Sequence, residues 1–88
     1  MKHRIEVKIF GQIQGVGFRL FIARKARELG IAGFTQNMPD GSVEIVAEGE
    51  EEQLKELIKH LQFGPGKIEK ATTQWQRFEE EFKGFEVK

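Results

Sequence analysis

The hydrophobic period of this chain switches between the two-residue spacing of a strand and the three- to four-residue spacing of a helix. Ile5, Val7 and Ile9 alternate with charged residues, which predicts a strand with one buried face. Phe18 and Ile22 begin a run at helical spacing. The predicted order is strand, helix, strand, strand, helix and strand over about 4–9, 18–29, 34–37, 43–47, 50–61 and 68–78, followed by a short fifth strand or extended tail over Phe85 and Val87.

The order of these elements restricts the fold more than any single segment does. It is the split βαβ arrangement of a ferredoxin-like sandwich, which has the element order βαββαβ. We therefore predict an α+β fold in which two helices pack on one face of an antiparallel sheet, with residues 1–88 forming a single domain. The outward face of the third strand, with Glu44, Val46 and Glu48, is then expected to be solvated and largely acidic.

The composition excludes several classes of protein. The chain has no cysteine, so it forms neither a disulfide framework nor a thiolate zinc site nor a cysteine nucleophile. Its 14 basic and 14 acidic residues cancel, and no global field draws it onto nucleic acid or anionic lipid. It contains neither the apolar stretch of a signal peptide nor a membrane span. We expect a cytoplasmic monomer with no nucleic-acid or membrane partner.

A glycine-rich loop separates the first strand from the first helix. Gly11, Gly15 and Gly17 lie within seven residues. Glycine permits positive φ and lacks the Cβ that would block a ligand, so loop N–H groups and the positive end of the helix can surround a phosphate. Arg19 stands at the start of that helix, where a cation is unfavourable unless an anion binds beside it. The alternative is a solvated arginine in a tight turn. The glycine spacing matches neither a P-loop nor a dinucleotide-binding motif.

Two segments resemble the signature motifs of the acylphosphatase family. Residues 11–19, GQIQGVGFR, match G-x-V-Q-G-V-x-F-R except for Ile13. Residues 33–44, GFTQNMPDGSVE, match G-[FYW]-V-x-N-x-x-D-G-x-V-E except for Thr35. The two motifs occur in the expected order and spacing, and the similarity covers essentially the whole chain, with its weakest part over 68–83. The chain is thus similar to acylphosphatases in both of its motifs.

The resemblance implies hydrolysis of the carboxyl-phosphate bond of acyl phosphates to a carboxylate and inorganic phosphate. A carboxylate leaves as a weak base with a pKa of about 4, so positioning and charge stabilisation can supply most of the catalysis without a general acid. The family pattern implies that Arg19 and Asn37 are catalytic, with Arg19 at the phosphoryl oxygens and Asn37 orienting the attacking water. The implied phosphate-binding residues are Gln14, Gly15, Val16, Gly17, Phe18 and Arg19.

The same resemblance implies a small-molecule substrate and no metal or cofactor. Inorganic phosphate is expected as the product and as a competitive inhibitor. His3 and His60 are expected at the surface, and neither has a partner at the spacing of metal ligands. Considered alone, Asn37 could equally be a residue that starts the turn containing Pro39. The first motif is what favours a catalytic role for it.

Three other interpretations predict different features. An RNA-recognition module has the same element order, but it needs exposed aromatic residues on its central strands and a basic surface. A copper chaperone needs paired cysteines. A non-catalytic phosphate-binding or regulatory ferredoxin-like module, of the kind found at the front of larger carbamoyl-transfer maturation proteins, would keep the loop. The chain lacks the cysteine clusters that follow in those proteins, so we expect a self-contained enzyme.

Overall fold

The strands and helices predicted from the sequence are present in the computed structural model, which describes residues 1–88. Several strands extend beyond the predicted ranges because ladder pairing continues past the alternating apolar residues, and the second helix passes into a short 3₁₀ helix, η1. The elements are β1 (Lys2–Gln12), α1 (Phe18–Glu28), β2 (Ala32–Asn37), β3 (Val43–Glu50), α2 (Glu51–His60), η1 (Leu61–Phe63), β4 (Lys67–Arg77) and β5 (Phe85–Val87).

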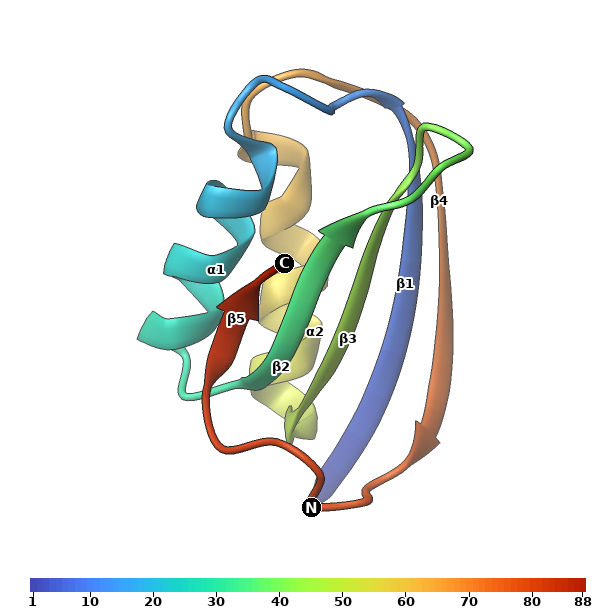
Figure 1. Ribbon diagram of the computed structural model, residues 1–88. Coiled ribbons are helices and arrows are strands. Elements are labelled where there is room, and N and C mark those ends of the chain that lie inside the picture. The colour runs from blue at the N-terminus through green and yellow to red at the C-terminus, as the bar shows by residue number, and fades with distance from the viewer.

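The strands form a single five-stranded sheet in the order β4-β1-β3-β2-β5. Neighbouring strands are antiparallel except β2 and β5, which run parallel. Both helices lie on the same face of this sheet (Figure 1). The ferredoxin-like α+β fold is therefore confirmed, with one correction. The sheet is mixed, because the last residues of the chain form a true strand that pairs with β2 in parallel.

The core lies between the sheet and the two helices. Alternate residues of β1 and β3 are paired across the ladder and buried together, so the period seen in the sequence matches the buried face. Phe18 is 1% exposed and anchors the first turn of α1 in this core. The other largest fully buried hydrophobic side chains are those of Ile5, Val7, Ile9, Ile13, Ile22, Val43, Ile45, Leu54 and Leu57. Neither α1 nor α2 has the length and apolar composition that crossing a bilayer requires.

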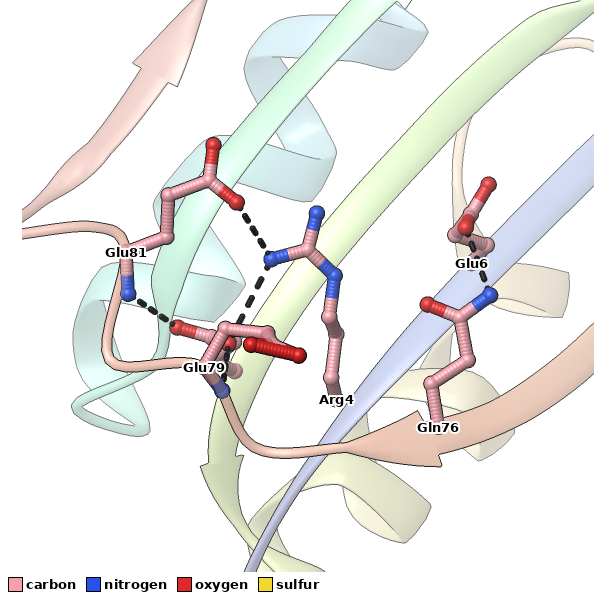
Figure 2. A network of polar contacts seen from close by, with 6 residues as sticks. Arg4, Glu6, Gln76, Glu79 and Glu81 are labelled. Carbon is pink, nitrogen blue, oxygen red and sulfur yellow. Dashed lines mark hydrogen bonds and ion pairs between the residues drawn. The ribbon is translucent and has the colours of Figure 1, made fainter.

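The outer face of β3 does not match the prediction of a solvated acidic surface. Glu48 is only 2% exposed. Its carboxylate accepts the backbone N–H groups of Glu79 at 2.7 Å and Glu81 at 2.9 Å. Nη1 of Arg4 lies 3.4 Å from the same carboxylate and 2.7 Å from that of Glu81, and Figure 2 shows Arg4 and Glu81 pointing toward each other. The segment between β4 and β5 therefore folds over this end of the sheet and buries Glu48.

Candidate active site

The loop after β1 and the turn between β2 and β3 lie at the same end of the sheet (Figure 1), where the side chain of Gln14 bonds to the turn. The strand register places these two segments together, because Ile9 near the end of β1 and Asn37 at the end of β2 are both paired with Val43. The start of α1 follows directly from the first of these segments. The two motifs found in the sequence are thus brought together by the sheet.

Gly15 and Gly17 set the shape of the loop. Their φ angles are 76° and 87°, in the left-handed region that favours glycine. A Cβ at either position would meet no atom within 4 Å, so this side of the backbone is open. Gly17 is the N-cap of α1, no side chain caps the helix, and its first turn contains no acidic residue. The positive end of α1 is therefore free to face an anion.

The backbone N–H groups of the loop are unpaired. None of those from Gln14 to Gly17 donates to an acceptor within the protein. All four of these residues are exposed. Successive unpaired amides that lead into a helix N-terminus form the kind of concave donor set that binds phosphate oxygens.

The side chain of Gln14 joins the loop to the β2–β3 turn. Its Nε2 donates to the backbone oxygen of Met38 at 3.1 Å and to that of Ser42 at 3.0 Å. Met38 also donates its N–H to the oxygen of Ser42 at 2.8 Å, which closes the turn. The sequence pattern implied a backbone contact from Gln14 to phosphate and gave no indication of this side-chain role. Gln14 fixes the position of one motif relative to the other.

Arg19 is the second residue of α1 and is half-buried. Its Nη1 donates to the backbone oxygen of Lys88, which follows β5. Lys88 donates its own N–H to the oxygen of Thr35 in β2 at 2.8 Å. The guanidinium is therefore held on the side of α1 that faces β2. This contact joins residues 69 positions apart and has no signal in the sequence.

Asn37 is the last residue of β2. Its Oδ1 is buried and has no hydrogen-bond partner, and the nitrogen is the accessible end of the amide. Buried polar atoms in native proteins nearly always have a partner, and exceptions are often found where a water or ligand binds. Asn37 therefore combines a buried oxygen with an NH2 group that is free to donate.

Asp40 stabilises the turn that follows Asn37. Its Oδ1 accepts the backbone N–H of Ser42 at 2.9 Å, and its Oδ2 lies 3.4 Å from Nζ of Lys8. Hydrogen bonds from the hydroxyl and the backbone N–H of Ser42, with a smaller effect of Lys8, hold the pKa of Asp40 below its ordinary value. The carboxylate is ionised and already bonded, so its role is to shape the turn.

The remaining residues assigned to phosphate binding fall on the same continuous stretch of chain. Val16 is half-exposed and Phe18 is buried in the core. Both side chains are apolar, so only the backbone N–H of each residue can donate to a phosphate. His3 lies 3.1 Å from Glu51, and the ring of His60 stacks on Phe21. No three His, Asp or Glu side chains are grouped to hold a metal ion. The positive charge at the site comes from Arg19 and the helix.

Comparison with known proteins gives matches over nearly the whole chain. The family model described as Acylphosphatase matches residues 5–87. A protein named acylphosphatase from Thermus thermophilus is 44% identical over 86 residues, which cover 96% of this chain and 97% of that protein. One of the same name from Caldanaerobacter subterraneus subsp. tengcongensis is 39% identical over 89 residues, with 99% of each covered. The crystal structure of acylphosphatase from Bacillus subtilis matches with a TM-score of 0.92 at 31% identity, covering 99% of this chain and 98% of that one.

Proposed function

Because the chain belongs to the acylphosphatase family and hydrolyses acyl phosphates to a carboxylate and inorganic phosphate, we propose which of its groups perform each step. The loop from Gln14 to Arg19 holds the phosphoryl group, and Asn37 orients the attacking water. The observation that carries this proposal is the run of unpaired N–H groups from Gln14 to Gly17, which leads into an uncapped helix start beside Arg19.

The phosphoryl oxygens are bound by the loop amides and by Arg19. Guanidinium has five N–H donors in a planar fork, so the bond from Nη1 to Lys88 leaves several donors free for the substrate. These donors are in place before the substrate arrives, because the loop glycines and the Lys88 contact fix them. Preorganised donors of this kind stabilise the charge that shifts over the phosphoryl oxygens in the transition state.

The attacking water is held between Asn37 and the phosphoryl group. The NH2 group of Asn37 donates to the water oxygen, and a lone pair of that oxygen forms the new bond to phosphorus. The bond from phosphorus to the acyl oxygen breaks, and its electron pair leaves with the carboxylate. One water proton passes to a phosphoryl oxygen. An acyl phosphate dianion and water thereby give a carboxylate and dihydrogen phosphate.

The reaction proceeds without a metal ion or a general acid from the protein. The leaving carboxylate has a pKa of about 4 and needs no proton as it departs. Asp40 is held ionised by its bonds to Ser42, with Lys8 beside it, so it offers no proton to the leaving group. Arg19 and the loop amides supply the stabilisation that a metal gives in other phosphoryl-transfer enzymes.

The same geometry leads to two further parts of the proposal. The loop amides and Arg19 bind the phosphoryl part of the substrate, so inorganic phosphate competes with the acyl phosphate for the site. The proposed phosphate loop, Arg19 and Asn37 need no residue from a second copy, so we include activity as a monomer in the proposal. Competitive inhibition by phosphate is measured from initial rates, and light scattering at assay concentration reports the oligomeric state. Inhibition that excess substrate does not relieve would contradict the first part, and a stable dimer would contradict the second.

Phosphate release from an aryl acyl phosphate tests the proposed function. We expect the purified protein to release phosphate well above the spontaneous rate. The Arg19→Ala variant is expected to lose this turnover, and the Asn37→Ala variant is expected to keep only a small residue of it. No turnover, combined with retained binding of inorganic phosphate, would instead favour the non-catalytic phosphate-binding or regulatory module.

A further inference from the structure

Thr35 carries a hydroxyl that is buried without a hydrogen-bond partner. The residue is 0% exposed, and no protein group bonds to its Oγ1. An unpaired buried hydroxyl destabilises a protein, whereas a valine of nearly the same shape avoids this cost. A threonine at this position therefore calls for a partner that the rest of the protein does not supply.

The register of β2 places Thr35 next to Asn37 on the helix-covered face of the sheet. Thr35 is paired with Ile45 and Asn37 with Val43, and both of these β3 residues are fully buried beneath the helices. On its other side, Thr35 is paired with Val87 of β5. The cross-strand neighbours of the hydroxyl are thus aliphatic. The polar side chain adjacent to it along the strand is Asn37.

Thr35 and Asn37 each have a buried side-chain oxygen without a hydrogen-bond partner. Oγ1 of Thr35 and Oδ1 of Asn37 are the buried side-chain polar atoms in the chain that have no hydrogen-bond partner. The Cα atoms of residues two apart on a strand are about 6.6 Å apart, and side chains on the same face can bring their polar atoms closer than this. One water molecule with hydrogen bonds of about 2.8 Å bridges two such atoms that are up to about 5.6 Å apart. A hydroxyl can donate to such a water, and the water can donate to the amide oxygen.

We propose that Thr35 is a positioning residue for the hydrolysis and that its hydroxyl shares one ordered water with Oδ1 of Asn37. The bridge holds the amide oxygen inward and keeps the NH2 group directed at the attacking water. Without it, the amide can rotate or exchange its two ends, and a smaller fraction of molecules presents the donor in the productive direction. This inference rests on the role proposed above for Asn37.

Substitutions at Thr35 separate this role from a packing role. The signature motif has valine at this position, so Thr35→Val is expected to fold, and Thr35→Ser keeps the hydroxyl while losing the methyl group. We expect Thr35→Val to lower kcat by roughly two- to tenfold, the loss of one hydrogen bond. The KM and the dissociation constant for inorganic phosphate are expected to stay unchanged. Thr35→Ser is expected to keep a kcat close to that of the wild type even if its unfolding temperature falls.

A double variant shows whether the effect passes through Asn37. In the Asn37→Ala background, Thr35→Val is expected to leave the residual turnover unchanged, because no amide remains to be positioned. The inference is overturned if Thr35→Val has the wild-type kcat, if Thr35→Ser loses as much as Thr35→Val, or if the loss persists in the Asn37→Ala background. Wild-type turnover in Asn37→Ala itself would overturn the role proposed for Asn37 and this inference with it.

Discussion

Arg19, at the start of α1, donates through Nη1 to the backbone oxygen of Lys88, beyond the last strand. Further along the same helix, Arg27 makes a similar contact, with Nε 3.2 Å and Nη2 2.8 Å from the oxygen of Phe85. Two arginines of α1 therefore hold β5 and the residue that follows it. Because Lys88 also bonds to Thr35 in β2, the guanidinium of Arg19 is tied to the strand that carries Asn37.

The contact between Arg27 and Phe85 is expected to contribute to stability without affecting the phosphate site. Arg27→Met removes two charge-assisted bonds to one backbone oxygen, and we expect the free energy of unfolding to fall by about 2 kcal/mol. Urea titration measures this change. Arg24→Met is the matched control, because Arg24 lies on the same helix, is exposed, and makes no hydrogen bond or ion pair. Equal stability of the two variants would contradict the role given to Arg27.

Gln14 is expected to affect activity through the position of the turn. Gln14→Ala removes both bonds to the backbone of the β2–β3 turn, so Asn37 and the loop are no longer held in register. Misplacement of catalytic groups is costly, and we expect kcat/KM to fall by about tenfold. Steady-state hydrolysis of an aryl acyl phosphate gives this value. Gln12→Ala, an exposed glutamine at the end of β1, is the control, and a similar loss there would point to a general effect on the loop.

The carboxylate of Glu48 makes the stability of the protein sensitive to acid. Burial acts to raise its pKa, but the N–H groups of Glu79 and Glu81, together with Arg4, hold the pKa below the ordinary value of 4.5. The stabilisation is therefore present above about pH 4.5 and is lost as the pH falls through the lower pKa of the folded state. We expect Glu48→Gln to lower the free energy of unfolding at pH 7 by about 3 kcal/mol and to weaken its dependence on acid pH.

The control for this prediction is an exposed glutamate. Glu69→Gln in β4 is expected to change stability by no more than about 0.5 kcal/mol and to keep the acid dependence of the wild type. Denaturant unfolding at pH 7 and pH 4 supplies both comparisons. If Glu48→Gln were as stable as Glu69→Gln at pH 7, the buried carboxylate would not be what holds the segment after β4.

The sequence predicted the fold because its hydrophobic period matches the buried face of β1 and of both helices. Ile5, Val7 and Ile9 are buried as the alternation required, and Phe18 anchors α1 as the helical spacing required. The same alternation wrongly placed Glu48 in solvent. Periodicity assigns a side chain to a face of the sheet, but it does not show whether a distant segment of the chain covers that face.

For the candidate site, the sequence supplied the proposed residues but not the contacts that position them. The two motifs predicted a glycine loop beside Arg19 and a turn after Asn37, and the register brings both to one end of the sheet. The bonds from Gln14 to the turn and from Arg19 to Lys88 were not predicted. Both hydrogen bonds depend on how segments that are far apart in the sequence are placed next to each other in the fold. The residue types and their spacing did not indicate these two contacts.

Turnover is expected to continue after treatment with a chelator. The donors proposed for the phosphoryl group are Arg19 and backbone amides, and no cluster of His, Asp and Glu side chains is grouped to ligate a metal. Initial rates before and after dialysis against EDTA measure this directly. A loss of activity that a single divalent ion restores would show that the proposed electrostatic role of Arg19 is insufficient.

Replacement of Arg19 and replacement of Asn37 are expected to have different effects on phosphate binding. Arg19→Ala is expected to abolish turnover and also to weaken binding of inorganic phosphate, because a charge-assisted contact of about 1.5 to 3 kcal/mol is lost from the ground state and the transition state together. Asn37→Ala is expected to be nearly as inactive but to bind phosphate about as well as the wild type, since its hydrogen bond acts on the water.

Calorimetric phosphate dissociation constants, set beside turnover numbers, separate these two patterns. Because Arg19 also bonds to Lys88, its variant must first be shown to be folded, and far-UV circular dichroism with urea unfolding provides that control. Arg19→Lys adds a second test, since a lysine keeps the charge but lacks the planar fork, so it is expected to recover part of the phosphate affinity and little of the turnover. If Asn37→Ala kept most of its turnover, or lost phosphate affinity as severely as Arg19→Ala, then Asn37 would be acting on the phosphoryl group rather than on the water.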